Sequence, residues 1–272
     1  MHKKVNYKFD KEKQKSWFPY SVSDVKDDFI IQNGVHGHCP NEICDDDCNS
    51  DNVKYWHNFK IDDIIDNSPE IGCFGCSFTY GSFLSQMDTW PNILGQELSL
   101  DTGNFGVPGG GADSCFVNLK NAFHRYKIKK AIILLPVMAR RLLKFELNSL
   151  HFQMPIGPHT EWPFDVFASQ QYFDKNFIME KIQAVKNEIQ KDSDNAYSKN
   201  IVYEIKKFCK INEIDLYASS WDFETYRYLK DESINLLPFY DMSFSNQRAG
   251  DGQHPCRQHN VDWVSTIKTR IL

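Results

Sequence analysis

Residues 70–81 read Glu70-Ile-Gly-Cys-Phe-Gly-Cys-Ser77-Phe-Thr-Tyr-Gly81, and this stretch decides the fold. Its first half is a short apolar run that ends in glycine, which is typical of a buried strand. Ser77 follows closely, so we expect its hydroxyl on a tight turn at the strand's carboxyl end, with its backbone N–H facing a developing oxyanion. A serine in this place also commonly caps the next helix. Alone, the stretch leaves both roles open.

Segments of helical and strand character alternate in the rest of the chain. The pattern predicts helices over 89–98, 112–126, 174–190, 194–211 and 261–272, and strands over 100–107, 131–135, 215–219 and 234–240. This alternation implies an α/β fold with a parallel sheet and helices on both faces. Residues 144–170 lack periodicity and hold three prolines, so we expect a long loop or insertion there.

Parallel sheets of this kind bind ligands at the carboxyl ends of their strands. That rule brings Ser77, Gly109, Met138 and residues 241–254 to one edge. The glycine belongs to the segment Asn104-Phe-Gly-Val-Pro-Gly-Gly-Gly111. Glycines after a strand let backbone N–H groups approach a ligand, and a helix N-terminus behind them adds a positive dipole end. The alternative is an ordinary strand-to-helix turn.

The segment Asp251-Gly-Gln-His-Pro255 supplies the partners that a serine nucleophile needs. An imidazole takes the serine proton, and a carboxylate fixes the imidazole tautomer and stabilises its charged form. Asp251 and His254 are three residues apart in a loop with glycine and proline, so one turn can bring them together. The alternative is a turn with a stray histidine.

Together, and in this order, these segments resemble the sequence blocks of SGNH (GDSL-like) hydrolases over roughly residues 68–272. The resemblance implies a flavodoxin-like three-layer α/β/α sandwich and the hydrolysis of esters without a metal or cofactor. It implies Ser77, Asp251 and His254 as the catalytic triad, and the N–H groups of Ser77 and Gly109 as oxyanion-hole donors.

The chain departs from this family after the third strand of the domain. There the family has an asparagine that completes the oxyanion hole, and here Met138 falls at that position. Methionine cannot donate a hydrogen bond. Arg140 or Arg141 could replace the donor or hold an anionic substrate, and the alternative is that both are surface charges.

Composition narrows the partners. With 31 basic and 36 acidic side chains, the net charge is −5, and a mildly acidic chain lacks the basic footprint of nucleic-acid binding. Its longest apolar run is far short of a membrane span, and its N-terminus lacks a signal-peptide pattern, so we expect a cytoplasmic protein.

Residues 1–66 differ from the rest and are rich in Lys, Asp and Asn. We expect an irregular N-terminal arm over 1–66 and the hydrolase-like domain over 67–272. Three cysteines of the arm, Cys39, Cys44 and Cys48, could form a zinc knot, but their spacing is not standard and a polar loop with free thiols is the favoured interpretation.

The sequence therefore predicts an esterase for a small acyl group such as acetyl, carried by a small molecule or a glycan. An acyltransferase would use the same acyl-serine, with an alcohol in place of water. A binding or structural module with a decayed site is the third hypothesis, and the departure at Met138 motivates it.

Overall fold

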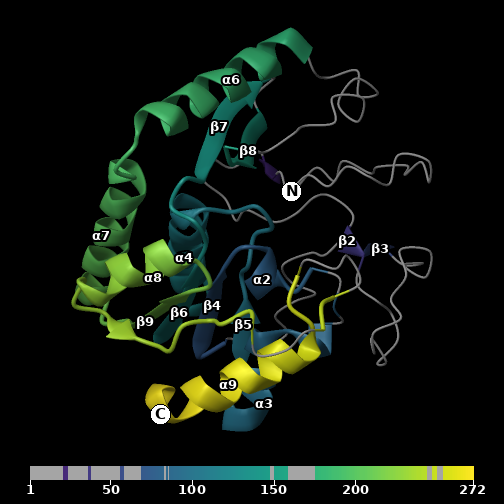
Figure 1. The fold of residues 1–272 in the computed structure, drawn as a ribbon, viewed down its shortest axis with the longest axis vertical. Helices are drawn as coiled ribbons and strands as arrows, with labels where there is room; N and C mark the ends of the chain where they lie inside the picture. Colours follow the sequence, from purple (N-terminus) through teal and green to yellow (C-terminus); the bar gives the residue numbers. More distant parts are fainter. Residues whose placement is uncertain are drawn as a thin grey trace.

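A parallel sheet forms the centre of the computed structural model, which describes residues 21–23, 36–37, 56–57, 69–82, 84, 86–147, 150–158, 175–243, 247–249 and 254–272. Its strands are β4 (Ile71–Gly75), β5 (Thr102–Asn104), β6 (Lys130–Leu135), β9 (Asp215–Ser220) and β10 (Asn235–Leu236) (Figure 1). They lie in the order β10-β9-β6-β4-β5, all parallel. This is the flavodoxin-like order, and it confirms the predicted fold class.

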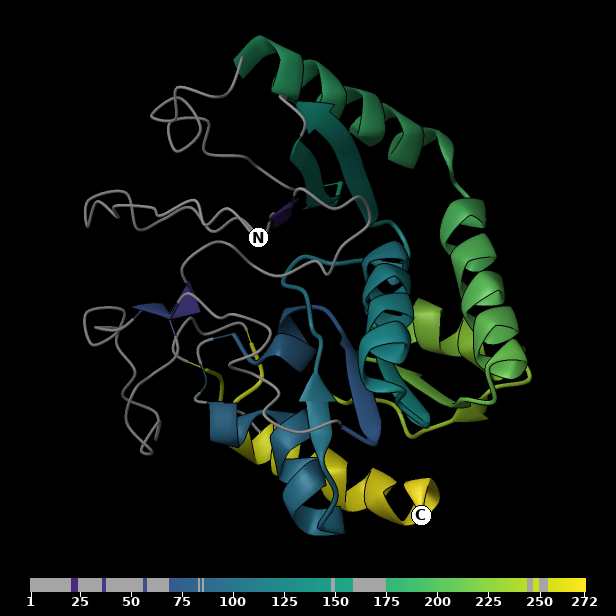
Figure 2. The same cartoon turned by 180° about the vertical axis from the view of Figure 1, so that it is seen from behind.

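Helices cover both faces of the sheet (Figure 2). On one face lie α3 (Trp90–Leu98) and α9 (Arg257–Ile271); on the other lie α4 (Ala112–Tyr126), α7 (Ala196–Ile211) and α8 (Phe223–Lys230). In β6, Ile132 and Leu134 pack toward the first pair and Ile133 toward the second set. Successive side chains of a strand point to opposite faces, so a fully apolar run is what a doubly covered strand requires.

The expectation of a loop over residues 144–170 is wrong for part of that range. An antiparallel hairpin of β7 (Arg141–Leu147) and β8 (Leu150–Ile156) occupies it, and α6 (Lys175–Lys191) packs on the hairpin. The two strands and the helix share an apolar cluster of their own, made of Leu143, Met154, Ile156, Ile178, Ile182 and Ile189. The insertion is therefore a small packed unit.

Most of the predicted N-terminal arm lies outside the described residues. Three short strands of it are described: β1 (Ser21–Ser23), β2 (His36–Gly37) and β3 (Trp56–His57). β1 pairs antiparallel with β8, so one piece of the arm extends the sheet of the insertion. β2 pairs with β3. The domain boundary at residue 66 stays a prediction.

A buried carboxyl joins the insertion to the main domain. Asp113, in the first turn of α4, accepts hydrogen bonds from the backbone N–H groups of Leu142 and Ser114 and from the Tyr197 hydroxyl. Burial raises the pKa of Asp113, and these hydrogen bonds oppose that shift. One side chain thus links α4, β7 and α7.

Within the described ranges, every helix is too short or too polar to cross a bilayer.

Candidate active site

Ser77 begins a single helical turn, α2 (Ser77–Tyr80), directly beyond the carboxyl end of β4. The turn is sharp because Gly75 leaves room for it. A Cβ on Gly75 would lie 2.1 Å from the Thr79 hydroxyl oxygen and 2.7 Å from the Leu134 carbonyl oxygen. Cys76 is fully buried, while Ser77 is half-buried at the sheet edge. The cap position of α2 belongs to Cys76 and no side chain caps the helix, so Ser77 is the first helical residue and not the cap.

Asn104, at the end of β5, ties the glycine-rich segment to this turn. Its side-chain Nδ2 donates to the carbonyl oxygens of Thr79, at 2.9 Å, and Tyr80, at 3.3 Å. Its Oδ1 accepts from the Gly106 N–H at 3.1 Å. A Cβ on Gly106 would lie 2.3 Å from the Tyr80 nitrogen, so the backbone at Gly106 packs directly against the backbone of α2. Asn104 therefore holds the glycine-rich segment against the turn that begins with Ser77, a role that the sequence did not predict.

Gly109 lies in the turn between β5 and α4 with a φ of 72°, in the left-handed region that favours glycine. The turn is held to the nucleophile strand, because the Val107 N–H donates to the Gly75 carbonyl at 2.8 Å and the Gly110 N–H closes back onto Val107. Among the described residues, the N–H groups of Ser77 and Gly109 have no acceptor. Both are therefore available to an oxyanion.

His254 packs against the residue next to Ser77. Its imidazole meets the Phe78 ring edge-on, with centroids 5.6 Å apart, although the two are far apart in sequence. The His254 carbonyl accepts from the Ala249 N–H at 2.9 Å, and residues 248 and 255 form a β-bridge. These contacts hold the histidine at the base of a loop. Asp251 lies outside the described residues, so the complete triad stays a prediction.

A second histidine stabilises the base of the same loop. His259 is fully buried, with Nε2 3.1 Å from an Arg248 nitrogen and Nδ1 3.3 Å from the Cys256 sulfur. Nε2 also lies 3.0 Å from the Met242 carbonyl oxygen, so it has both a donor and an acceptor within hydrogen-bond distance. The other Arg248 nitrogen donates to the Met242 carbonyl at 3.1 Å. This arrangement is structural and fixes the start of α9.

Aromatic rings line the edge between Ser77 and β9. Trp221 directly follows β9 and stacks on Phe78 with centroids 4.8 Å apart, while Tyr240 approaches the same ring at 6.0 Å. The Tyr240 hydroxyl donates to Asn260 at 2.7 Å, which fixes this ring on α9. An apolar wall therefore lies beside the candidate nucleophile.

Met138 does not reach this edge. Its side chain is 9% exposed and belongs to the core beneath α4 and α7. Its carbonyl accepts from the Ser198 hydroxyl, which ties the loop after β6 to α7. Met138 thus contributes packing through its side chain and a hydrogen bond through its carbonyl oxygen.

The two arginines after β6 have different surroundings. Arg141 forms an ion pair with Asp192 at 2.6 Å and lies over the Tyr197 ring, so it joins the insertion to α7. Arg140 instead points toward the glycine-rich turn and Trp221, with its guanidinium 5.8 Å from the indole centroid. Of the pair, Arg140 alone faces the candidate site.

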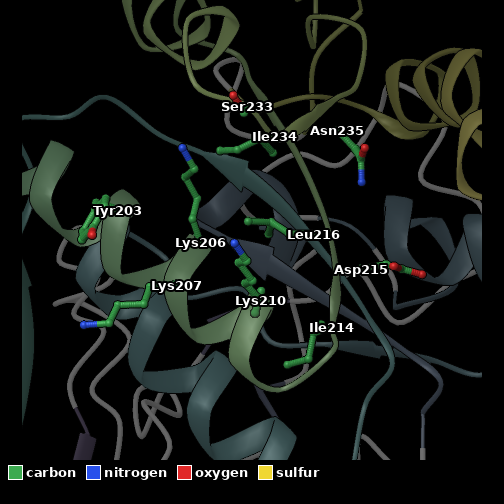
Figure 3. Close-up of a pocket in the computed structure, with 11 residues that line it drawn as sticks. Tyr203, Lys206, Lys207, Lys210, Ile214, Asp215, Leu216, Ser233, Ile234 and Asn235 are labelled. Carbon is green, nitrogen blue, oxygen red and sulfur yellow. The ribbon is translucent and has the colours of Figure 1, made fainter.

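A cleft of about 610 Å³ lies at the other edge of the sheet, near the first residues of β9 and β10 (Figure 3). Lysines of α7 line it, and one of them, Lys206, forms an ion pair with Glu232 at 2.5 Å. Parallel sheets of this order use the carboxyl edge for chemistry. The candidate site is therefore the edge at Ser77 and not this cleft.

Groups of three or more metal-ligating side chains are absent from the described residues. The cysteines Cys39, Cys44 and Cys48 lie outside them. The hypothesis of a zinc knot in the arm stays untested.

Solved structures of GDSL-type enzymes are similar to this chain over most of its length. A GDSL-like lipase from Bacteroides thetaiotaomicron VPI-5482 is 12% identical, covering 76% of this chain and 89% of its own, with a TM-score of 0.40. A psychrotrophic esterase, EstA, from Pseudoalteromonas sp. is 12% identical, covering 74% and 96%, with a TM-score of 0.41. At this identity and TM-score neither neighbour assigns a function.

No protein-family model and no curated protein matches this chain.

Proposed function

We propose that this chain is a serine ester hydrolase of the SGNH type, with Ser77 as nucleophile, His254 as base and Asp251 as its carboxylate partner. The packing of His254 on Phe78 carries the proposal, because it brings the imidazole to the turn that begins with Ser77. The sheet edge agrees, since Ser77 and Gly109 follow neighbouring strands.

The reaction follows from these positions. His254 takes the proton of Ser77 as its oxygen attacks the ester carbonyl carbon, and the N–H groups of Ser77 and Gly109 stabilise the oxyanion. The tetrahedral intermediate collapses and expels the alcohol, which receives the proton from His254. Water, deprotonated by His254, then attacks the acyl-serine, and collapse of this second intermediate releases the acid while His254 returns the proton to the Ser77 oxygen.

The proposed substrate carries a small acyl group such as acetyl, on a small molecule or a carbohydrate. Support comes from the stacked rings of Phe78, which directly follows Ser77, and Trp221, which directly follows β9. Such faces also suit the C–H surfaces of a sugar ring.

The test is turnover of acetyl, butyryl and octanoyl esters, with acetylated xylose as the carbohydrate, followed in a pH-stat. We expect acetyl esters to be cleaved fastest, and Ser77→Ala and His254→Gln each to lower kcat by roughly 10⁴-fold or more. Ser265→Ala, at an exposed serine on α9, is the matched control. Full turnover by Ser77→Ala would refute the assignment.

A further inference from the structure

We propose that Arg140 and the indole N–H of Trp221 form an anion-recognition subsite, which selects esters bearing a carboxylate or phosphate near the scissile bond. This inference rests on the proposed function, because it names the substrate class of the same site.

Arg140 lies near both proposed halves of the site, the oxyanion turn and the nucleophile turn. Arg140 comes after β6, which lies between β4 and β9 in the sheet. Ser77 follows β4, and Trp221 follows β9. The Arg140 guanidinium lies over the Trp221 ring at 5.8 Å and donates to the Gly110 carbonyl at 3.4 Å. Gly110 is the neighbour of the proposed oxyanion donor, and Trp221 stacks on the neighbour of the proposed nucleophile. The Arg140 guanidinium therefore contacts both the turn that holds Gly109 and the tryptophan that stacks beside Ser77.

Arg140 lacks an acidic partner among the described residues, although it is half-buried. Its neighbour Arg141 has the partner expected of a structural arginine, the Asp192 carboxylate. A partly desolvated guanidinium without a counter-charge is unfavourable unless a ligand supplies that charge. Its planar fork matches a carboxylate or phosphate with two parallel hydrogen bonds.

The Trp221 indole provides an independent observation. Its Nε1 is buried and has no hydrogen-bond acceptor in the described part of the chain. Buried donors are nearly always satisfied, so an orphan at a site edge points to an acceptor that arrives with a ligand. The guanidinium, which lacks a counter-charge, and the indole, which lacks an acceptor, belong to residues in contact.

The experiment compares esters that differ only in charge. Monomethyl succinate against dimethyl succinate places the carboxylate on the acyl side, and acetoxyacetate against its methyl ester places it on the alcohol side. For at least one pair, we expect wild type to prefer the anion. Arg140→Gln should lower the anion-to-neutral ratio of kcat/KM by about 10-fold or more, and Trp221→Phe, which keeps a ring but loses the N–H, by less.

Arg227→Gln, which breaks an exposed pair with Glu224 on α8, is the matched control and should leave the ratio as it is. Arg140→Lys keeps the charge without the fork and should recover part of the ratio. An unchanged ratio for both pairs in Arg140→Gln would overturn the proposal. So would an equal loss on charged and neutral esters, which would indicate a donor to the oxyanion.

Binding separates this proposal from the proposed function. In a Ser77→Ala background, calorimetric titration with monomethyl and dimethyl succinate and with the acetoxyacetate pair measures affinity without turnover. We expect Arg140→Gln to weaken binding of the preferred anion about 10-fold and to narrow its difference from the neutral ester. If wild type turns over none of these esters but the Ser77→Ala protein still binds the anion more tightly and Arg140→Gln weakens that binding, the esterase is refuted and the subsite is kept. Equal affinity for charged and neutral esters in both pairs would refute the subsite.

Discussion

Asn104 decides how firmly the nucleophile turn is held, because its amide binds two carbonyl oxygens of α2 and one N–H of its own loop. We expect Asn104→Ala to cost about 1–3 kcal/mol of unfolding free energy. It should also lower kcat by about 10- to 100-fold, because small displacements of a nucleophile are expensive. Urea denaturation and steady-state kinetics measure the two effects.

Asn212→Ala is the control for that variant. Its amide donates to the Phe208 carbonyl at 2.8 Å and ends α7, away from Ser77. It should lose stability and keep kcat. An Asn104→Ala variant that loses stability alone would show that the clamp has no catalytic consequence.

A substitution at Gly109 tests the proposed oxyanion hole. Gly109→Ala should cost about 1–2 kcal/mol, because φ is 72° there, and should lower kcat by roughly 100-fold by displacing a donor. Asn195→Ala also places alanine at a left-handed position, with φ of 54°, at the start of α7. If both variants lose only stability, Gly109 is not an oxyanion donor.

The sequence predicted the location of residues that directly follow a strand. It did not predict which way the side chains of a loop point. The position of Ser77 was predictable because its strand is a short apolar run, whereas the strand predicted over 100–107 ends at Asn104. Whether Met138 faces the site or the core, and which of Arg140 and Arg141 faces it, depends on how the loop after β6 turns. A shift of one residue in the course of this loop exchanges a side chain that faces the site for one that faces away from it.

At the scale of elements, the Asp113 carboxyl couples α4 to the insertion. Its pKa is raised by burial, so the native state holds this proton more tightly than the unfolded chain does. As pH rises from about 3.9 toward the raised pKa, wild type therefore loses stability. Asp113→Asn lacks this titration. Between pH 4 and pH 7, the unfolding free energy of wild type should therefore fall relative to that of Asp113→Asn.

Urea denaturation of both proteins at several pH values measures this difference. Glu232 titrates in the opposite sense, because its hydrogen bond from Lys206 lowers its pKa, but it is common to both proteins and cancels. A difference that is constant with pH would show that the pKa of Asp113 is the same in the folded and the unfolded protein.

The helices and strands of the main domain were largely predictable, because long apolar periodicity survives packing on a sheet. α4 has the predicted bounds, and α6 and α7 begin and end within two residues of theirs. α8 was missed since eight residues give few periods. The hairpin was missed because the prolines of residues 144–170 suggested a loop, although Leu143, Phe145 and Leu147 alternate with polar residues.

For the whole molecule, the sheet order explains why residues distant in sequence share one edge. Ser77, Gly109, Arg140 and Trp221 follow four adjacent strands, and the loop before α9 brings His254 to them. The alternation of strands and helices predicted this edge. It could not give the contacts on it, because these depend on side-chain packing between elements.

Metal removal tests the molecule as a whole. A serine nucleophile with an imidazole base needs no metal, so turnover should survive dialysis against a chelator. Elemental analysis before and after dialysis gives the zinc content. Stoichiometric zinc whose removal abolishes turnover would contradict a purely serine-based mechanism.

The most direct test of the central claim is covalent labelling with a fluorophosphonate, followed by mass spectrometry of the peptides. An activated serine attacks phosphorus, whereas an ordinary surface serine does not. We expect one label per chain, on Ser77, and labelling at least 100-fold slower in His254→Gln. A folded wild-type protein that takes no label at neutral pH, or takes it on another serine, would contradict the account.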